Sequence, residues 1–268
     1  MTFMDHALAR RLERAESAIG TSFIEVRKRV TPLVGATWCD FDGTYALFDG
    51  FDSPMTQTFG LGLHAEPTPD AVAAIETYFG ERGAPSMHEI SSLAPTPTIA
   101  MLVERGYRPI DQSMVLVQPL VASEPAPSPL HIRTLERHEH AAWIDASVVG
   151  WSQDPQFSHV VRELSEVAVE NPVMTHFLVE SDGEMIATGS LGVHEDVALL
   201  AGASTIPSGR GRGAQNLLLA TRLAEAHRRG CRLALMITAP GSTSQRNAER
   251  RGFRVAYART KWRRDLIA

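Results

Sequence analysis

The two halves of this sequence carry similar motifs in the same order. Glu81-Arg82-Gly83 precedes an apolar stretch and then Glu104-Arg105-Gly106-Tyr107. In the second half, Arg228-Arg229-Gly230 precedes an apolar stretch and then Arg250-Arg251-Gly252-Phe253. Gly83 and Gly230 lie 147 positions apart, and Gly106 and Gly252 lie 146 apart, so one gap aligns the two copies. Self-similarity over this distance predicts two similar domains in tandem.

Each copy reads as a helix, a glycine stop, a strand, a second helix, an Arg-Gly-aromatic run and a strand. A glycine at the end of a helix suits the left-handed residue of a C-cap, and the aromatic residue after it can pack back on the helix. Between the copies, the segment 121–129 contains three prolines, which favour extended chain. The expected division is therefore a first domain at 1–121, a linker at 122–129 and a second domain at 130–268.

The second half shows a recognisable order of elements. A short strand at 131–133, helices at about 135–148 and 156–169, and hairpin-linked strands at 175–181, 184–194 and 197–206 are expected from periodicity. Asp182-Gly183 between apolar runs indicates a hairpin turn. A helix at 214–229, a strand at 232–239, a helix at 243–251 and a last strand around 255–262 follow. These elements predict an α/β fold with a mixed, mainly antiparallel sheet flanked by helices in each domain.

Composition excludes several classes of protein. The net charge of -5 and the pI near 6.1 give no global basic field, so neither nucleic acid nor an anionic membrane is expected as a partner. The sequence contains no apolar run of about 18 residues and no signal-like start. Cys39 and Cys231 do not make a disulfide scaffold, so we expect a cytoplasmic protein.

The segment most suggestive of chemistry is Pro207-Ser208-Gly209-Arg210-Gly211-Arg212-Gly213, between a strand and a helix. Closely spaced glycines let the backbone approach an anion, and the free N–H groups at a helix N-terminus favour phosphate or pyrophosphate. Arg210 and Arg212 can add charge-assisted hydrogen bonds. A surface turn with two solvated arginines is the alternative.

Two other nucleotide loops compete with this interpretation. A P-loop requires Gly-Lys-Ser/Thr, and that sequence does not follow Gly213. Gly209, Gly211 and Ala214 satisfy G-x-G-x-x-A of the dinucleotide fingerprint, which also needs an acidic residue at the end of the next strand. Here that strand ends Ile237-Thr238-Ala239-Pro240, without an acid.

The run Pro207 to Ala214 resembles the P-x-x-R-G-x-G-[small apolar] loop of the GCN5-related N-acetyltransferase (GNAT) superfamily, and the resemblance covers the whole second half. It implies an acyl-CoA co-substrate, acetyl-CoA or another acyl-CoA, with no metal. By the same resemblance, the backbone of Thr205 and Ile206 would pair with pantetheine. The pyrophosphate would be held by Arg210, Gly211, Arg212, Gly213, Ala214 and Gln215. Gln215 departs from the usual Gly or Ala, which is tolerable if its side chain points outward.

Further residues follow from the same resemblance. Ser244 and Asn247 would face CoA from the helix before Gly252. The tyrosine that often protonates the leaving thiolate is replaced by Ala248, and the strand 199–205 has no ionisable side chain that could act as general base. The base remains open among water, His176, Glu180 and His194, so no catalytic residue is assigned.

The resemblance also implies an acceptor site under the loop between the first two helices, here 149–155, where Trp151 could form a wall and Asp154 could attract an amine. The corresponding turn of the first half, 65–69, has neither a glycine cluster nor an arginine, so that half is not expected to bind CoA. The sequence thus predicts an acyl-CoA-dependent N-acyltransferase for a small-molecule amine. The alternative is a non-catalytic acyl-CoA sensor. The oligomeric state stays open.

Overall fold

The computed structural model describes residues 5–151 and 155–266. None of the helices in these ranges combines the length and apolar character needed to cross a bilayer. The residues form two compact units: unit 1 contains Met1–Gln118 together with Met236–Ala268, and unit 2 contains Pro119–Leu235.

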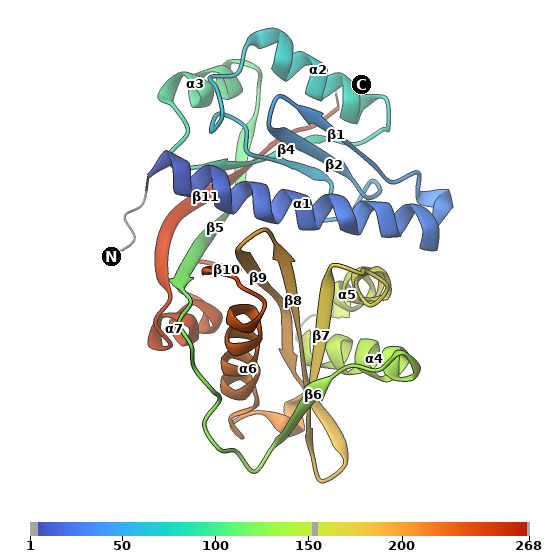
Figure 1. The fold of residues 1–268 in the computed structure, drawn as a ribbon. Helices are drawn as coiled ribbons and strands as arrows, with labels where there is room; N and C mark the ends of the chain where they lie inside the picture. The colour runs from blue at the N-terminus through green and yellow to red at the C-terminus, as the bar shows by residue number, and fades with distance from the viewer. Residues whose placement is uncertain (1–4, 152–154, 267–268) are drawn as a thin grey trace. The chain divides into compact units, whose positions relative to one another are not determined.

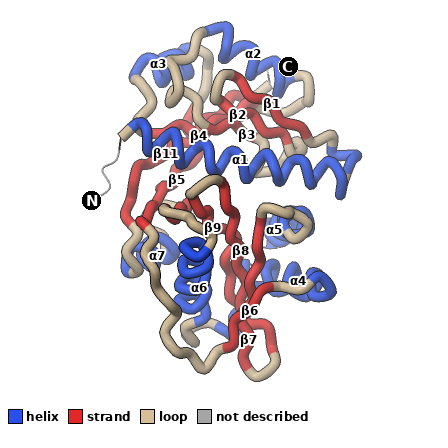
Figure 2. Tube along the Cα trace, viewed as in Figure 1, coloured by secondary structure: helices blue, strands red, loops and turns tan. Residues whose placement is uncertain are grey.

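Unit 2 is a sheet with helices on both faces (Figures 1 and 2). Its elements are β6 (His131–Thr134), the 3-10 turn η2 (Arg137–Glu139), α4 (His140–Trp151), α5 (Pro155–Ala168), β7 (Met174–Ser181), β8 (Glu184–His194), β9 (Val197–Thr205), η3 (Pro207–Gly209), α6 (Ala214–Arg228) and the start of β10 (Leu233–Thr238). The strand order is β10-β9-β8-β7-β6, antiparallel except for β9 with β10.

Two neighbouring residues of β8 show which helix covers which face of this sheet. Thr188 shares a hydrogen bond with Ser147 of α4, while a Cβ at Gly189 would meet Leu218 and Arg222 of α6. Because successive strand residues point to opposite faces, α4 and α6 lie on opposite sides of the sheet.

Unit 1 also has helices on both faces of a sheet. It contains α1 (His6–Val30), η1 (Pro32–Val34), β1 (Thr37–Phe41), β2 (Thr44–Phe48), β3 (Gln57–Phe59), α2 (Pro69–Gly80), β4 (Ser86–Ser91), α3 (Thr96–Glu104), β5 (Arg108–Pro119), α7 (Thr243–Arg250) and β11 (Arg254–Arg264). A Cβ on Gly20 of α1 would meet Leu47, whereas Ala46 and Phe48 cluster with residues of α2. Alternation along β2 therefore places α1 and α2 on opposite faces.

The predicted fold class is confirmed, and the repeat is visible in the strand pairing. The only parallel pair described in each unit joins the strands on either side of one helix: β3 and β4 around α2, and β9 and β10 around α6. The predicted glycine C-caps are confirmed as well. Tyr107 N–H bonds Leu102 O at 2.9 Å, and Phe253 N–H bonds Ala248 O at 3.1 Å, across left-handed Gly106 and Gly252.

The compact units do not follow the expected domain limits of 1–121 and 130–268. The last strand of the second copy, β11, lies in unit 1, where it pairs antiparallel with β4 on one side and β5 on the other (Figure 1). Backbone hydrogen bonds to both strands therefore tie β11 to the first copy.

Strand β3 of unit 1 is short. The segment 55–64 forms a strand only at Gln57–Phe59. Gly60 and Gly62 take φ of 84° and 79°, and Leu63 N–H bonds Gly60 O, so the chain turns where a strand would have continued.

Buried charges connect α1 to β11 inside unit 1. Arg259 Nε and Tyr257 OH each donate to Glu13 Oε1 at 2.7 Å, and Arg259 Nη2 donates to Glu16. Glu13 and Arg259 are each only 1% exposed. Burial raises the pKa of Glu13.

Candidate acyl-CoA site

The glycine-rich loop leads directly into the N-terminus of α6. Gly213 occupies the N-cap position with φ of 88°, a left-handed conformation that L-residues rarely adopt, and no side chain caps the helix. The first intrahelical bond runs from Leu217 N–H to Gly213 O at 3.1 Å. The N–H groups of the first turn, including those of Ala214 and Gln215, therefore have no intrahelical acceptor. This is the arrangement that favours an anion.

The strand that enters this loop has a free edge. β9 pairs with β10 only from Val197 to Leu199. Within the described part of unit 2, no strand pairs with residues 200–205 on that side. The edge has backbone donors and acceptors suited to an extended ligand with amide groups.

A β-bulge interrupts β9 within the free edge. Thr188 of β8 is paired with Ser204 and Ser190 with Ala201, so a single residue, Gly189, faces both Gly202 and Ala203. Gly202 has φ of 61° and is exposed to solvent. The bulge therefore interrupts the regular ladder within the free edge.

Gln215 does not point outward, as the sequence had suggested it could. Its Nε2 donates to Ser204 O and to Thr205 Oγ1, both at 2.8 Å. The side chain therefore turns back from the first turn of α6 and ties it to the end of β9.

Both loop arginines contact other parts of unit 2. Arg210 donates to Thr205 O at 3.4 Å and to Gly150 O at 3.3 Å. Arg212 donates to Ser181 Oγ and pairs with Asp182 at 3.2 Å. Hydrogen bonds from Ser181 and then Arg212 hold the pKa of the Asp182 carboxyl below its usual range. The role of both arginines in pyrophosphate binding stays a prediction.

The end of α4 lies against the end of β9. A Cβ on Gly150 would stand 2.5 Å from Ser204 Oγ. Ser204 continues a buried hydroxyl chain to Thr188 at 2.8 Å and on to Ser147 of α4 at 3.0 Å. The next residue of α4, Trp151, is 51% exposed and therefore accessible beside the loop. Asp154 lies outside the described residues.

Ser244 and Asn247 lie in α7, which belongs to unit 1, so their contribution to a CoA site stays a prediction. Ser244 is exposed and Asn247 half-buried, and Asn247 Oδ1 accepts a hydrogen bond from Arg250 at 3.2 Å. Ala248, where a tyrosine would be the usual acid, is buried.

The three candidate side-chain bases are engaged or far from the loop. Both ring nitrogens of His176 have partners, Ser190 Oγ at 2.9 Å and Ala168 O at 2.8 Å, and burial lowers its pKa to about 4. Hydrogen bonds from Arg133 and His131 lower the pKa of Glu180. His194 is paired with Val197, at the opposite end of β9 from Thr205.

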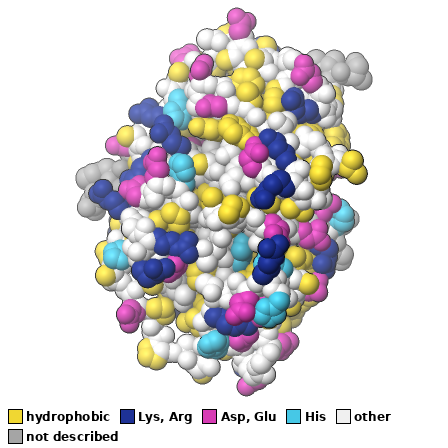
Figure 3. Space-filling model, turned by 45° about the vertical axis from the view of Figure 1, so that its right-hand side comes forward, with side chains coloured by type: hydrophobic (Ala, Val, Ile, Leu, Met, Phe, Trp, Pro, Cys, Tyr) yellow, Lys and Arg dark blue, Asp and Glu magenta, His cyan; other side chains and the backbone are white. Residues whose placement is uncertain are grey.

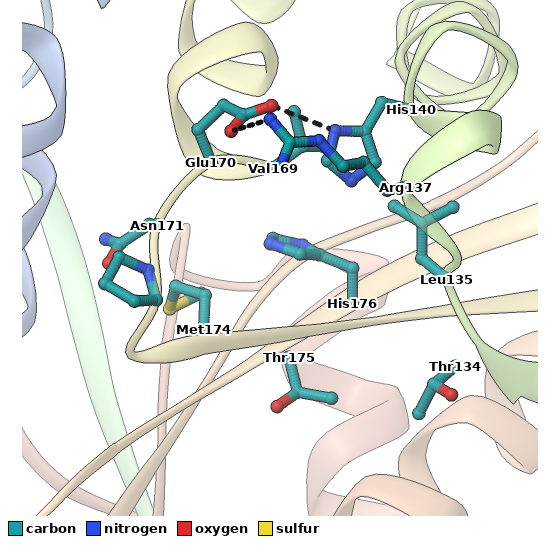
Figure 4. A pocket seen from close by; sticks show the side chains of 11 residues that line it. Thr134, Leu135, Arg137, His140, Val169, Glu170, Asn171, Met174, Thr175 and His176 are labelled. Atoms are coloured by element: carbon teal, nitrogen blue, oxygen red, sulfur yellow. Dashed lines mark hydrogen bonds and ion pairs between the residues drawn. The ribbon is translucent and has the colours of Figure 1, made fainter. Parts of the chain in front are cut away.

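Unit 2 also has a cavity of about 380 Å³ at another place. Figure 4 shows His176 among its lining residues, with Glu170 bonded to His140 at 3.2 Å and to Arg137 at 3.7 Å. The cavity includes Thr134 and Thr175, near the end of β6 and the start of β7. Because β7 and β9 run parallel, this end of the sheet is opposite the glycine-rich loop. None of the predicted CoA residues lines it.

One residue of the site region was not identified from the sequence. Arg222 of α6 is 2% exposed and donates to the backbone of β8 and β9. A signal was available, because Leu218, Arg222 and Ala226 are spaced four apart, which places a charge in an apolar stripe.

The distribution of charged and metal-binding side chains also bears on the possible ligands. The face of the molecule in Figure 3 shows acidic and basic side chains interspersed rather than one basic field. Among residues 5–151 and 155–266, no three His, Cys, Asp or Glu side chains gather as a metal site would require.

The part of the chain that contains this loop, helix and interrupted strand matches a protein-family model. Residues 133–253 match the model of the acetyltransferase (GNAT) family, so this part of the chain is a GNAT domain. The predicted recognition is confirmed. No curated protein matches the sequence significantly.

Solved structures share the fold over most of the chain. A GCN5-related N-acetyltransferase from Kribbella flavida is 17% identical, with a TM-score of 0.66 over 97% of this chain and 96% of that one. A GCN5-related N-acetyltransferase from Sphaerobacter thermophilus is 17% identical, with a TM-score of 0.54 over 78% and 74%. A tandem GNAT protein from the clavulanic acid biosynthesis pathway is 12% identical, with a TM-score of 0.57 over 82% and 78%. These similarities establish the fold.

Proposed function

We propose that this protein is an acyl-CoA-dependent N-acyltransferase that transfers an acetyl group from acetyl-CoA directly to the amine of a small molecule. The observation that carries the proposal is the continuity of two features in unit 2. The free edge of β9 at 200–205 leads into a glycine-rich loop and an uncapped helix N-terminus. An extended arm with amide groups, followed by a pyrophosphate, matches such a surface.

The corresponding helix of unit 1 supports restricting the site to unit 2. Thr68 Oγ1 accepts a hydrogen bond from Ala71 N–H at 3.1 Å, and Pro69 at the first position has no N–H. Fewer donors therefore remain for an anion at α2 than at α6.

The proposed reaction forms a C–N bond and breaks a C–S bond. The neutral amine attacks the thioester carbonyl, backbone N–H groups at the bulge stabilise the developing oxyanion, and the CoA thiolate leaves. The amine proton passes to water, since His176 is engaged and Ala248 has no ionisable group. Trp151, exposed beside the loop, and Asp154 are the proposed contacts of the acceptor.

A non-catalytic acyl-CoA sensor is the second candidate, favoured by the acid-free strand at 199–205 and by Ala248. Mixing the protein with acetyl-CoA, a thiol reagent and a panel of amines separates the two. Acceptor-dependent thiol release supports the enzyme. Tight CoA binding with no release across a broad panel supports the sensor.

The nucleotide preference has a simpler test. A ligand that binds the native state raises the melting temperature, by an amount equivalent to about 2.7 kcal/mol at 100 times Kd. We expect CoA to stabilise the protein and NAD to have no effect. Stabilisation by NAD alone would contradict the proposed function.

A further inference from the structure

Arg222 is a buried cation without an acidic partner. It lies in α6 and is 2% exposed, and no carboxylate pairs with it among the described residues. Its partners are three backbone carbonyls: Leu218 O at 3.2 Å, Ser190 O at 3.1 Å and Ala201 O at 3.3 Å.

Burying a guanidinium in this way is costly. Burial lowers the pKa of Arg222, but only to about 10, so the side chain remains a cation at neutral pH. A leucine at this position would extend the apolar stripe of Leu218 and Ala226 without any desolvation cost. A role that an apolar side chain cannot fill would explain the charge.

The carbonyls that Arg222 binds across the sheet flank the bulge. Ser190 of β8 and Ala201 of β9 are the paired residues immediately before Gly202 in the ladder. The guanidinium fits there because Gly189 has no side chain, since a Cβ at Gly189 would lie 3.3 Å from Arg222 Cζ. Ala201 O and Gly202 N–H belong to the same peptide group, so a cation bound to the oxygen strengthens the N–H as a donor.

Ser190 is also held from the opposite face of the sheet. Its hydroxyl lies 2.9 Å from His176 Nδ1, while its carbonyl accepts from Arg222. His176 Nε2 lies 2.8 Å from Ala168 O, a bond in which only the nitrogen can donate. Nδ1 of the neutral ring is then the acceptor, and Ser190 donates to it. Ser190, which pairs with Ala201 next to the bulge, is thus fixed by one hydrogen bond on each side.

We propose that Arg222 is a positioning residue that fixes the β9 bulge and polarises the Ala201–Gly202 peptide, so that Gly202 N–H becomes a strong donor for the thioester carbonyl. The inference rests on the proposed acyl-CoA function. Its structural part, the fixing of the bulge, can be tested without any ligand.

The test compares Arg222→Met and Arg222→Lys with Arg228→Met in the full chain. Arg228 lies on the same helix, and its side chain is 73% exposed, so it controls for the loss of a cation from α6. Gly189→Ala provides a second perturbation that keeps the charge, because the new Cβ would crowd the guanidinium. The measurements are hydrogen exchange of the segment 200–205 and the Kd of CoA and acetyl-CoA by calorimetry.

For Arg222→Met we expect exchange in 200–205 to accelerate about 10-fold or more, since a hydrogen bond to a charged group contributes about 1.5–3 kcal/mol. The acetyl-CoA Kd should rise about 10-fold, with Arg222→Lys and Gly189→Ala intermediate and Arg228→Met unchanged. If an acceptor is found, kcat should fall more than KM rises. A merely structural residue would alter stability without changing this ratio.

Unchanged exchange in 200–205 in both Arg222→Met and Gly189→Ala would overturn the proposal, whatever the ligand data. Faster exchange with unchanged acetyl-CoA affinity and turnover would reject the polarising role. If the wild-type protein binds neither CoA nor acetyl-CoA, the proposed function fails, and the exchange data alone decide whether Arg222 fixes the bulge. If Arg222→Met does not fold, hydrogen exchange of 200–205 in Gly189→Ala decides whether the proposal stands.

Discussion

Gly213 combines a left-handed backbone conformation with a position next to the proposed pyrophosphate site. Its φ of 88° is costly for any L-residue, while a Cβ there would touch no protein atom within 4 Å. Alanine at this position therefore acts through backbone strain and through the space left for a bound anion. Gly230, at the other end of α6, has φ of 84° and is equally open. The two glycines form a matched pair.

We expect Gly213→Ala and Gly230→Ala to destabilise the protein similarly, by about 1–2 kcal/mol. Only Gly213→Ala should weaken CoA binding, by about 10-fold, because only this glycine precedes the uncapped N–H groups. Denaturant unfolding and calorimetry measure the two effects. Equal loss of CoA affinity in both variants would place the anion elsewhere.

Gln215 offers a second test at the level of the residue. Its amide donates to Ser204 O and Thr205 Oγ1 at the mouth of the proposed pyrophosphate site. Gln215→Glu replaces those donors with a carboxylate that repels both carbonyl oxygen and phosphate. We expect the CoA Kd to rise about 10-fold or more. Gln112→Glu, at an exposed position of β5, is the control and should change the Kd less than threefold, which corresponds to about 0.7 kcal/mol. A similar rise of the CoA Kd in both variants would argue against a pyrophosphate site beside Gln215.

Among the elements, the contact of α1 with β11 depends on a buried ionic network. Arg259 bonds Glu13 and Glu16, and Arg259→Met leaves both acids without their cation. Removing one partner of a buried pair costs about 3–5 kcal/mol, so we expect that loss in urea unfolding. Glu13→Leu added to Arg259→Met should restore part of it, because one uncompensated buried charge is removed.

The control for this cycle lies on the same strand. Arg263 pairs with Asp265, and their side chains are 38% and 50% exposed. Arg263→Met should therefore cost less than about 1 kcal/mol. Additive losses in the Arg259→Met and Glu13→Leu pair would show that the network does not act as a unit.

Element identity was predictable because it rests on local signals. Gly106 and Gly252 cap their helices as the motif order indicated, and the alternating runs became β7, β8 and β9. The partner of the last strand was not predictable, since both copies supply an equivalent strand and its periodicity specifies a face rather than a neighbour. Pairing over more than 150 residues, as for Arg259 with Ser91, is a property of the whole fold.

In the candidate site, too, some features were predictable from local sequence and others were not. Glycine spacing located the loop, because turn geometry is encoded locally. The direction of the Gln215 side chain and the use of Arg222 as a donor to β8 and β9 depend on neighbours distant in sequence. The bulge at Gly202 also arises from pairing register, which residue types in 199–205 do not specify.

At the scale of the whole molecule, each unit contains a buried neutral histidine. Burial lowers the pKa of His88 in unit 1 to about 3 and that of His176 in unit 2 to about 4. Their unfolded values lie near 6.5. Below pH 6.5 the unfolded chain binds protons that the native state does not, so stability present above that pH is lost as the pH falls toward the native values.

We expect the free energy of unfolding to decrease between pH 6.5 and pH 4, with His176 accounting for up to about 3 kcal/mol. His176→Gln and His88→Gln should each flatten part of this dependence, measured by urea titration at several pH values. His6, exposed at the start of α1, is the control position. A pH profile unchanged in both variants would contradict the assignment of neutral native histidines.

The place of β11 has a consequence for how the protein is made. Unit 1 requires residues from both before and after unit 2 in the sequence, since β11 lies between β4 and β5, whereas unit 2 is formed by Pro119–Leu235. Domains usually fold in the order in which they are synthesised. Here the order is reversed: unit 2, although it follows most of unit 1 in the sequence, can complete first, whereas unit 1 must wait until the segment from Met236 onward has been synthesised.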